Sequence, residues 1–210
     1  MAYNLHYDRL LRTIQCGEEK EAISLFTSNL FDVNEQIEYI FEDRKRYTIT
    51  PLYWAVRHRR PQVCKYLLRN GARAYEHMVY EYYPLHEACN MGYDEIVQEF
   101  VEAKCNLDQV TSDCDTPLHV ACMRGHISCV HILLRAGADC NLQNKVGHTP
   151  LEAALYHNHR DMVGLFKAHD KGRPLCTCSI VCVTFSFCRG KVNGPIIPSF
   201  SPLCWGGVRE

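Results

Sequence analysis

Apolar side chains recur at helical spacing along most of the chain, in short blocks separated by glycine or polar turns. One block places four apolar residues on the same side of a helix: Ile127, Val130, Leu133 and Leu134. Gly125 precedes this block and Gly137 follows it, and glycine has the backbone freedom that a tight helix end needs. The pattern therefore predicts pairs of short antiparallel helices.

The same helix-pair pattern returns at a fixed period of 33 residues. Its marker is a triplet that starts each pair: Thr50-Pro51-Leu52, Tyr83-Pro84-Leu85, Thr116-Pro117-Leu118 and Thr149-Pro150-Leu151. Threonine is a good N-cap, and proline suits the first helical turn because no amide donor is needed there. Because helices this short are marginal alone, the period predicts a stacked array in which each pair buries its apolar stripe against the next.

The stretch from Thr116 to Asn141, which begins Thr116-Pro117-Leu118-His119, closely resembles the ankyrin repeat family. The resemblance covers about residues 10 to 170. It implies an all-α fold, an ankyrin-repeat solenoid of stacked helix-turn-helix units with hairpin-like fingers. The expected division is a degenerate N-terminal repeat at 5–36, an inserted finger loop at 37–49, repeats at 50–82, 83–115 and 116–148, a partial or capping repeat at 149–170, and a Cys-rich irregular tail at 171–210.

Some helix ends carry a residue other than glycine. Arg59 and Asn158 stand at the turn between two helices, and Lys104 occupies the position that Gly137 has one repeat later. We expect the backbone at Arg59 and Lys104 to be strained, because a left-handed conformation favours glycine. In the last repeat Lys167 replaces a core leucine, as the polar outer face of a terminal repeat requires.

The charge balance gives no broad attraction for nucleic acid, since 23 basic and 24 acidic residues leave a net charge of −1. We therefore expect no nucleic-acid partner. The apolar stretch of the tail is shorter than the roughly 20 residues of a membrane span, which argues against a membrane partner. The N-terminus has no apolar run of signal-peptide length, so a cytoplasmic or nuclear location is expected.

The 13 cysteines do not indicate a metal site or a catalytic centre. In the repeats, Cys64, Cys89, Cys122 and Cys129 occupy small or apolar helical positions, which predicts buried reduced thiols. The sequence has no paired C-x-x-C, phosphate loop, nucleophile elbow or HExxH motif, so we expect no enzyme activity, metal or cofactor. For the tail, lipidation and zinc binding stay open beside the favoured interpretation, an irregular segment produced by an alternative transcript ending.

The segments Pro84–Cys89 and Ser128–Leu134 are similar to ankyrin and SOCS box proteins, the substrate receptors of cullin-RING ubiquitin ligases. In that subgroup a C-terminal box recruits elongin B and C and a cullin. Leu175-Cys176 and Pro202-Leu203 match the sequence of such a box only over two residues each, so we interpret the box as missing or replaced. Two functions stay open: a plain protein-binding scaffold, and a ligase adaptor.

The resemblance also implies where a protein partner binds, on a concave face made by the first helices of the repeats and by the fingers. The candidate contact residues on the helices are Trp54, Arg57, His58, Glu87, Asn90, Met91, Val120, Met123, Arg124, Tyr156 and His157. The finger before Tyr83 adds Tyr75 and Tyr80. Aromatic, methionine and arginine side chains are common anchors of interfaces. The alternative for Trp54 and Tyr83 is packing between repeats.

Overall fold

The computed structural model describes residues 5–40, 46–75 and 82–169. The chain divides into two units, 1–173 and 174–210, and the second lies outside the described residues, as does the predicted Cys-rich tail. The helices of the first unit are α1 (Leu5–Cys16), α2 (Glu19–Thr27), α3 (Pro51–Arg57), α4 (Pro61–Arg69), α5 (Pro84–Met91), α6 (Asp94–Glu102), α7 (Pro117–Arg124), α8 (Ile127–Ala136), α9 (Pro150–Tyr156) and α10 (Val163–His169), with a 3₁₀ turn η1 (Arg160–Met162) before the last.

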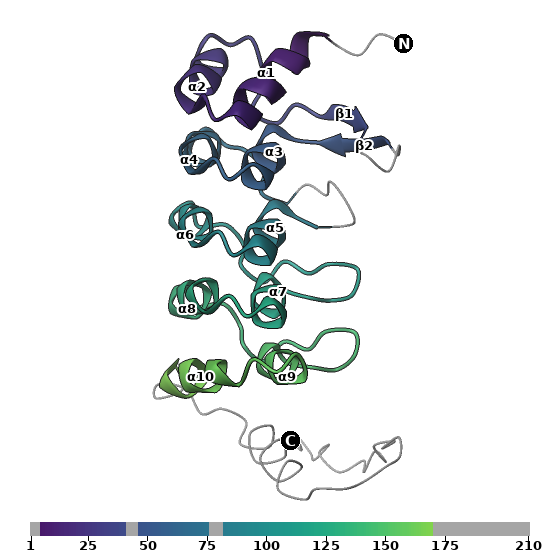
Figure 1. Ribbon diagram of the computed structural model, residues 1–210, viewed down its shortest axis with the longest axis vertical. Helices are drawn as coiled ribbons and strands as arrows, with labels where there is room; N and C mark the ends of the chain where they lie inside the picture. The colour runs from purple at the N-terminus through teal and green to yellow at the C-terminus, as the bar shows by residue number, and fades with distance from the viewer. Residues whose placement is uncertain (1–4, 41–45, 76–81, 170–210) are drawn as a thin grey trace, which may run out of the picture. The chain divides into compact units, whose positions relative to one another are not determined.

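The helices form two rows, one of first helices and one of second helices (Figure 1). Each first helix from α1 to α9 packs on the next first helix, and the second helices from α2 to α10 do the same. The helix-turn-helix solenoid predicted from the 33-residue period is confirmed, and it includes the irregular pair α1 and α2 at the N-terminal end.

Three helices of the first row begin at a threonine cap. The side chains of Thr50, Thr116 and Thr149 each accept a hydrogen bond from the backbone amide three residues on. In α7 and α9 the side chain of that third residue, His119 or Glu152, also accepts a hydrogen bond from the backbone amide of the threonine. The two bonds together form a capping box. Tyr83 makes no such side-chain bond before α5, so its repeat relies on Pro84 and on packing to start the helix.

The predicted left-handed helix ends are confirmed. The φ angles of Arg59, Lys104 and Asn158 are 53°, 55° and 68°, beside 80° at Gly125. A side chain at Gly125 would also place its Cβ 2.6 Å from the His159 ring of the next repeat. Glycine is needed at this position both for the turn and for the close approach of the neighbouring repeat.

The core runs between the two rows and continues from one repeat to the next. Leu67, Phe100 and Leu133 occupy equivalent positions on α4, α6 and α8, and each is fully buried. The four cysteines predicted to be buried have no exposed surface: Cys64, Cys89, Cys122 and Cys129. Burial raises the pKa of the Cys129 thiol to about 12, so this sulfur packs as a neutral apolar group.

Buried histidines join successive repeats. The Nε2 of His86 lies 3.0 Å from the carbonyl oxygen of Asp115, and the Nε2 of His119 lies 3.0 Å from that of His148. Since a carbonyl only accepts, each imidazole donates a hydrogen bond to the last residue of its own repeat, which directly precedes the first helix of the next. The bonds therefore hold the finger that connects the two repeats.

The longer first finger contains an antiparallel hairpin of two strands, β1 (Ile37–Ile40) and β2 (Arg46–Ile49). Ile37 pairs with Ile49, and both are buried against the helices. The next pair, Glu38 and Thr48, points to the opposite side of the hairpin and is exposed. Tyr39 then pairs with Tyr47, and both are half-buried. The sequence predicted only a finger loop here, and paired strands add to that expectation.

Candidate protein-binding face

Three positions each on α3, α5 and α7, and two on α9, were predicted to face a partner, and the first of the three positions is buried in all four helices. Trp54, Glu87 and Val120 are 3, 6 and 2% exposed, and Ala153 at the same position is 2% exposed. These residues lie where neighbouring first helices pack together, so their side chains are covered by the stack. The expectation that Trp54, Glu87 and Val120 are exposed contact residues is therefore wrong.

Trp54 joins the N-terminal repeat to the rest of the array. Its indole Nε1 donates a 2.9 Å hydrogen bond to the carbonyl oxygen of Leu11 in α1. Its ring lies 4.7 Å from the ring of Tyr39 in β1 and 4.4 Å from that of His58. Trp54 thus packs between repeats, the alternative that the sequence left open, and Tyr83 is also buried at 6%.

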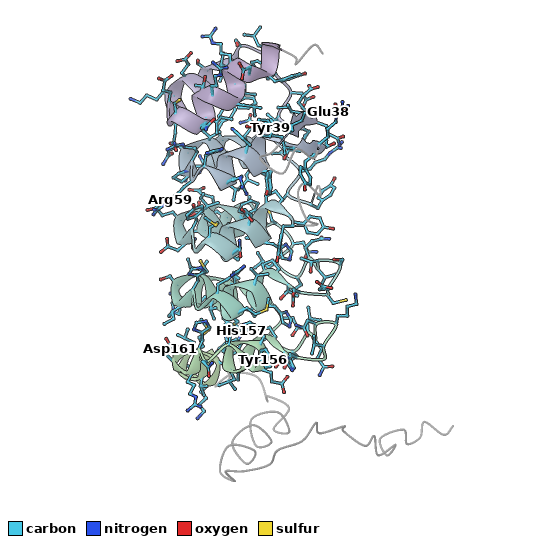
Figure 2. All side chains as sticks on the ribbon, turned by 45° about the vertical axis from the view of Figure 1, so that its right-hand side comes forward. Glu38, Tyr39, Arg59, Tyr156, His157 and Asp161 are labelled. Atoms are coloured by element: carbon cyan, nitrogen blue, oxygen red, sulfur yellow. The ribbon has the colours of Figure 1, made fainter. Side chains whose placement is uncertain are left out.

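The other two positions on each first helix reach solvent. Arg57, Met91, Arg124, Tyr156 and His157 are exposed, whereas His58, Asn90 and Met123 are half-buried. Tyr156 has 73% of its surface exposed, and Figure 2 shows it beside His157 at the end of α9. The rings of Tyr156 and His157 lie 5.4 Å apart. These positions form a continuous row over α3, α5, α7 and α9.

A polar chain crosses three repeats along this row. Arg57 Nη1 lies 3.3 Å from Glu87 Oε1, and Arg124 Nε donates a 2.8 Å hydrogen bond to Asn90 Oδ1. Burial raises the pKa of Glu87 above its ordinary value, and Arg57 and the Asn90 amide partly oppose this shift. The buried carboxylate therefore depends on the two flanking arginines and the amide.

Comparison with protein-family models finds ankyrin repeats at residues 85–173, as three copies, and at residues 47–76. Together these matches cover more than half of the chain. The chain belongs to the ankyrin repeat family. A search of curated proteins gives no match. Ankyrin repeats are protein–protein interaction modules, so the face described above is the candidate site of this ankyrin array.

The fingers of the ankyrin array carry exposed apolar residues that sequence reasoning missed. Ile40, Val110 and Val146 are 36, 42 and 75% exposed, and Tyr75, which was predicted, is 60% exposed. For Val110 and Val146 the signal was a single apolar residue among polar neighbours in a finger. Tyr80, also predicted, lies outside the described residues.

A hollow of about 620 Å³ opens at the bases of two neighbouring ankyrin fingers. Tyr75 lines it from one repeat, and Tyr83, Cys105, Asn106 and Gln109 line it from the next. Within residues 5–40, 46–75 and 82–169, no group of three His, Cys, Asp or Glu side chains is placed to hold a metal ion. In the same ranges no helix is both long and apolar enough to cross a membrane.

Proposed function

We propose that this ankyrin array is a non-enzymatic scaffold that binds a protein partner across its first helices and fingers. One observation carries the proposal: large exposed apolar side chains gather on that side. Of eight such residues in the described ranges, only Leu30 and Ile127 lie elsewhere. The others are Ile40, Tyr75, Met91, Val110, Val146 and Tyr156. Exposed apolar groups collected on one side of a soluble domain are typical of an interaction surface.

Met91 and Tyr156 are the best anchors on the helical part of this face. They lie two repeats apart and are 46 and 73% exposed. Tyrosine combines a large apolar ring with a polar hydroxyl, and methionine adapts to irregular partner surfaces. Both features favour binding at the centre of an interface.

The test is partner capture by the double variant Met91→Ala/Tyr156→Ala. We expect the amount of captured partner to fall at least about tenfold, since truncating two anchors costs more than about 1.4 kcal/mol of binding free energy. The measurement is quantitative mass spectrometry after affinity purification from cells. The fold should be unaffected, because both side chains are exposed, and circular dichroism checks this.

Leu30→Ala/Ile127→Ala is the matched control, because it removes two exposed apolar side chains, 53 and 43% exposed, from outside the face. We expect unchanged capture. If the control variant lost the partner and the face variant kept it, the proposed face would be wrong.

The finer alternative is a substrate adaptor of a cullin-RING ubiquitin ligase, located in the cytoplasm or nucleus. It is supported only by the sequence similarity to ankyrin and SOCS box proteins, and the segment that would hold the box lies outside the described residues. An adaptor would co-purify with elongin B and C at stoichiometric levels. Absence of both under conditions that retain them on a known SOCS box protein would leave the scaffold function alone.

A further inference from the structure

On the binding face the acidic side chains are held by neighbouring groups, whereas the arginines are accessible. Helices α3, α5, α7 and α9 carry two carboxylates, Glu87 and Glu152. Glu152 accepts hydrogen bonds from the Thr149 amide and hydroxyl at 2.8 and 2.9 Å, so it serves the helix cap. The Glu87 side chain is only 8% exposed and is enclosed by the polar chain described above. Both acidic groups are therefore engaged inside the array.

The arginines of the same row remain accessible. The Arg57 side chain is 43% exposed while it contacts Glu87, and Arg124 is exposed while its Nε bonds to Asn90. An arginine has five N–H donors in a planar fork, and in both residues part of this fork reaches solvent, where a partner carboxylate can approach it. Two guanidinium groups flank one buried carboxylate, which leaves the centre of the row with an excess positive charge.

Apolar side chains accompany these arginines. Met91 follows Asn90 at the end of α5, and Met123 precedes Arg124 at the end of α7. Met91 is exposed and Met123 is half-buried. A segment that lies across α3, α5 and α7 would therefore meet cationic and apolar groups in alternation.

We propose that the partner segment bound on this row is acidic, with carboxylates held by Arg57 and Arg124 and apolar side chains placed on Met91 and Met123. The inference rests on the proposed function and names the chemistry of its partner. Carboxylates are favoured because guanidinium binds them through paired, charge-assisted hydrogen bonds. Among the exposed finger carboxylates, Asp113 is paired with Lys145 at 3.5 Å, whereas Asp139 would repel such a segment if it approached the fingers.

The experiment uses the full 210-residue chain and two labelled peptides in fluorescence anisotropy. One peptide repeats Glu-Leu-Ser, and the other repeats Lys-Leu-Ser. Each is about 12 residues long, which in extended form spans three helices packed roughly 10 Å apart. We expect the acidic peptide to bind, and its binding to weaken as salt is raised, whereas the basic peptide does not bind.

Three variants locate the binding. The double variant Arg57→Gln/Arg124→Gln should lower the affinity for the acidic peptide about tenfold. Glu87→Gln keeps the side-chain shape and removes the opposing negative charge, so it should strengthen binding by about two- to fivefold. Arg135→Gln, an exposed arginine on α8 in the other row, should leave binding unchanged.

Equal binding of the two peptides, no binding of the acidic peptide, or equal weakening by Arg135→Gln would each overturn the acidic-partner inference. The scaffold function is judged separately by Met91→Ala/Tyr156→Ala. If this variant loses its cellular partner while the acidic peptide fails to bind the wild-type chain, the face binds a partner of other chemistry. If Met91→Ala/Tyr156→Ala keeps its cellular partner, the proposed binding face itself is wrong.

Discussion

Replacing Trp54 by alanine should lower the free energy of unfolding by about 3–5 kcal/mol, the range for truncating a large buried aromatic residue. The indole is 3% exposed and joins α1, β1 and α3. Because a terminal repeat is held only by its single neighbour, the loss should first release the α1–α2 pair. Denaturant unfolding gives the magnitude, and hydrogen exchange in residues 5–27 gives the location.

Trp54→Phe is the matched control. It retains a ring beside Tyr39 and removes the donor to the Leu11 carbonyl, so we expect a smaller loss of about 1–2 kcal/mol. A change below about 0.5 kcal/mol for Trp54→Ala would contradict the role of this residue as the link to the N-terminal repeat. Faster exchange confined to α9 and α10 would contradict it as well.

Replacing Phe100 by alanine should also cost about 3–5 kcal/mol, with a different consequence. Phe100 is fully buried in α6, which packs on α4 on one side and on α8 on the other. A cavity here weakens two interfaces in the middle of the array. Since repeats interact only with their neighbours, we expect unfolding to lose cooperativity and to occur in two steps. In a chain that also carries Trp205→Phe, so that Trp54 is the one tryptophan left, denaturation followed by circular dichroism and by tryptophan fluorescence should give separate midpoints.

Phe166→Ala makes the same chemical change at the equivalent position of the last repeat, where Phe166 is 3% exposed. Only one interface depends on it, so unfolding of the remaining repeats should stay cooperative and only α9 and α10 should exchange faster. Identical unfolding curves for Phe100→Ala and Phe166→Ala would show that the array behaves as one cooperative body.

Much of the fold is predictable because the repeat constrains local structure and packing together. Thr116 and Pro117 start a helix by local chemistry, Gly125 ends it, and Leu133 recurs at a fixed distance from its equivalents. Even departures such as Lys104 were predictable, because a neighbouring repeat showed which backbone conformation its position requires.

The binding face was only partly predictable. Helical spacing puts Glu87, Asn90 and Met91 on one side of α5, but it does not tell which of them the next helix covers. Burial of the first of the three depends on how closely successive first helices pack, which is a property of the stack. The pairing of β1 with β2 likewise depends on Ile37 and Ile49 finding a buried site against the helices.

Site-specific photo-crosslinking tests the central claim, that a protein partner occupies the row of first helices. Benzoylphenylalanine replaces Met91 or Tyr156 on the face, and in matched chains it replaces the exposed Glu102 or Arg135 on the other row. After irradiation in cells, positions 91 and 156 should join covalently to the same partner, and positions 102 and 135 should not. Cross-linking of that partner from positions 102 and 135, with none from 91 and 156, would contradict the account.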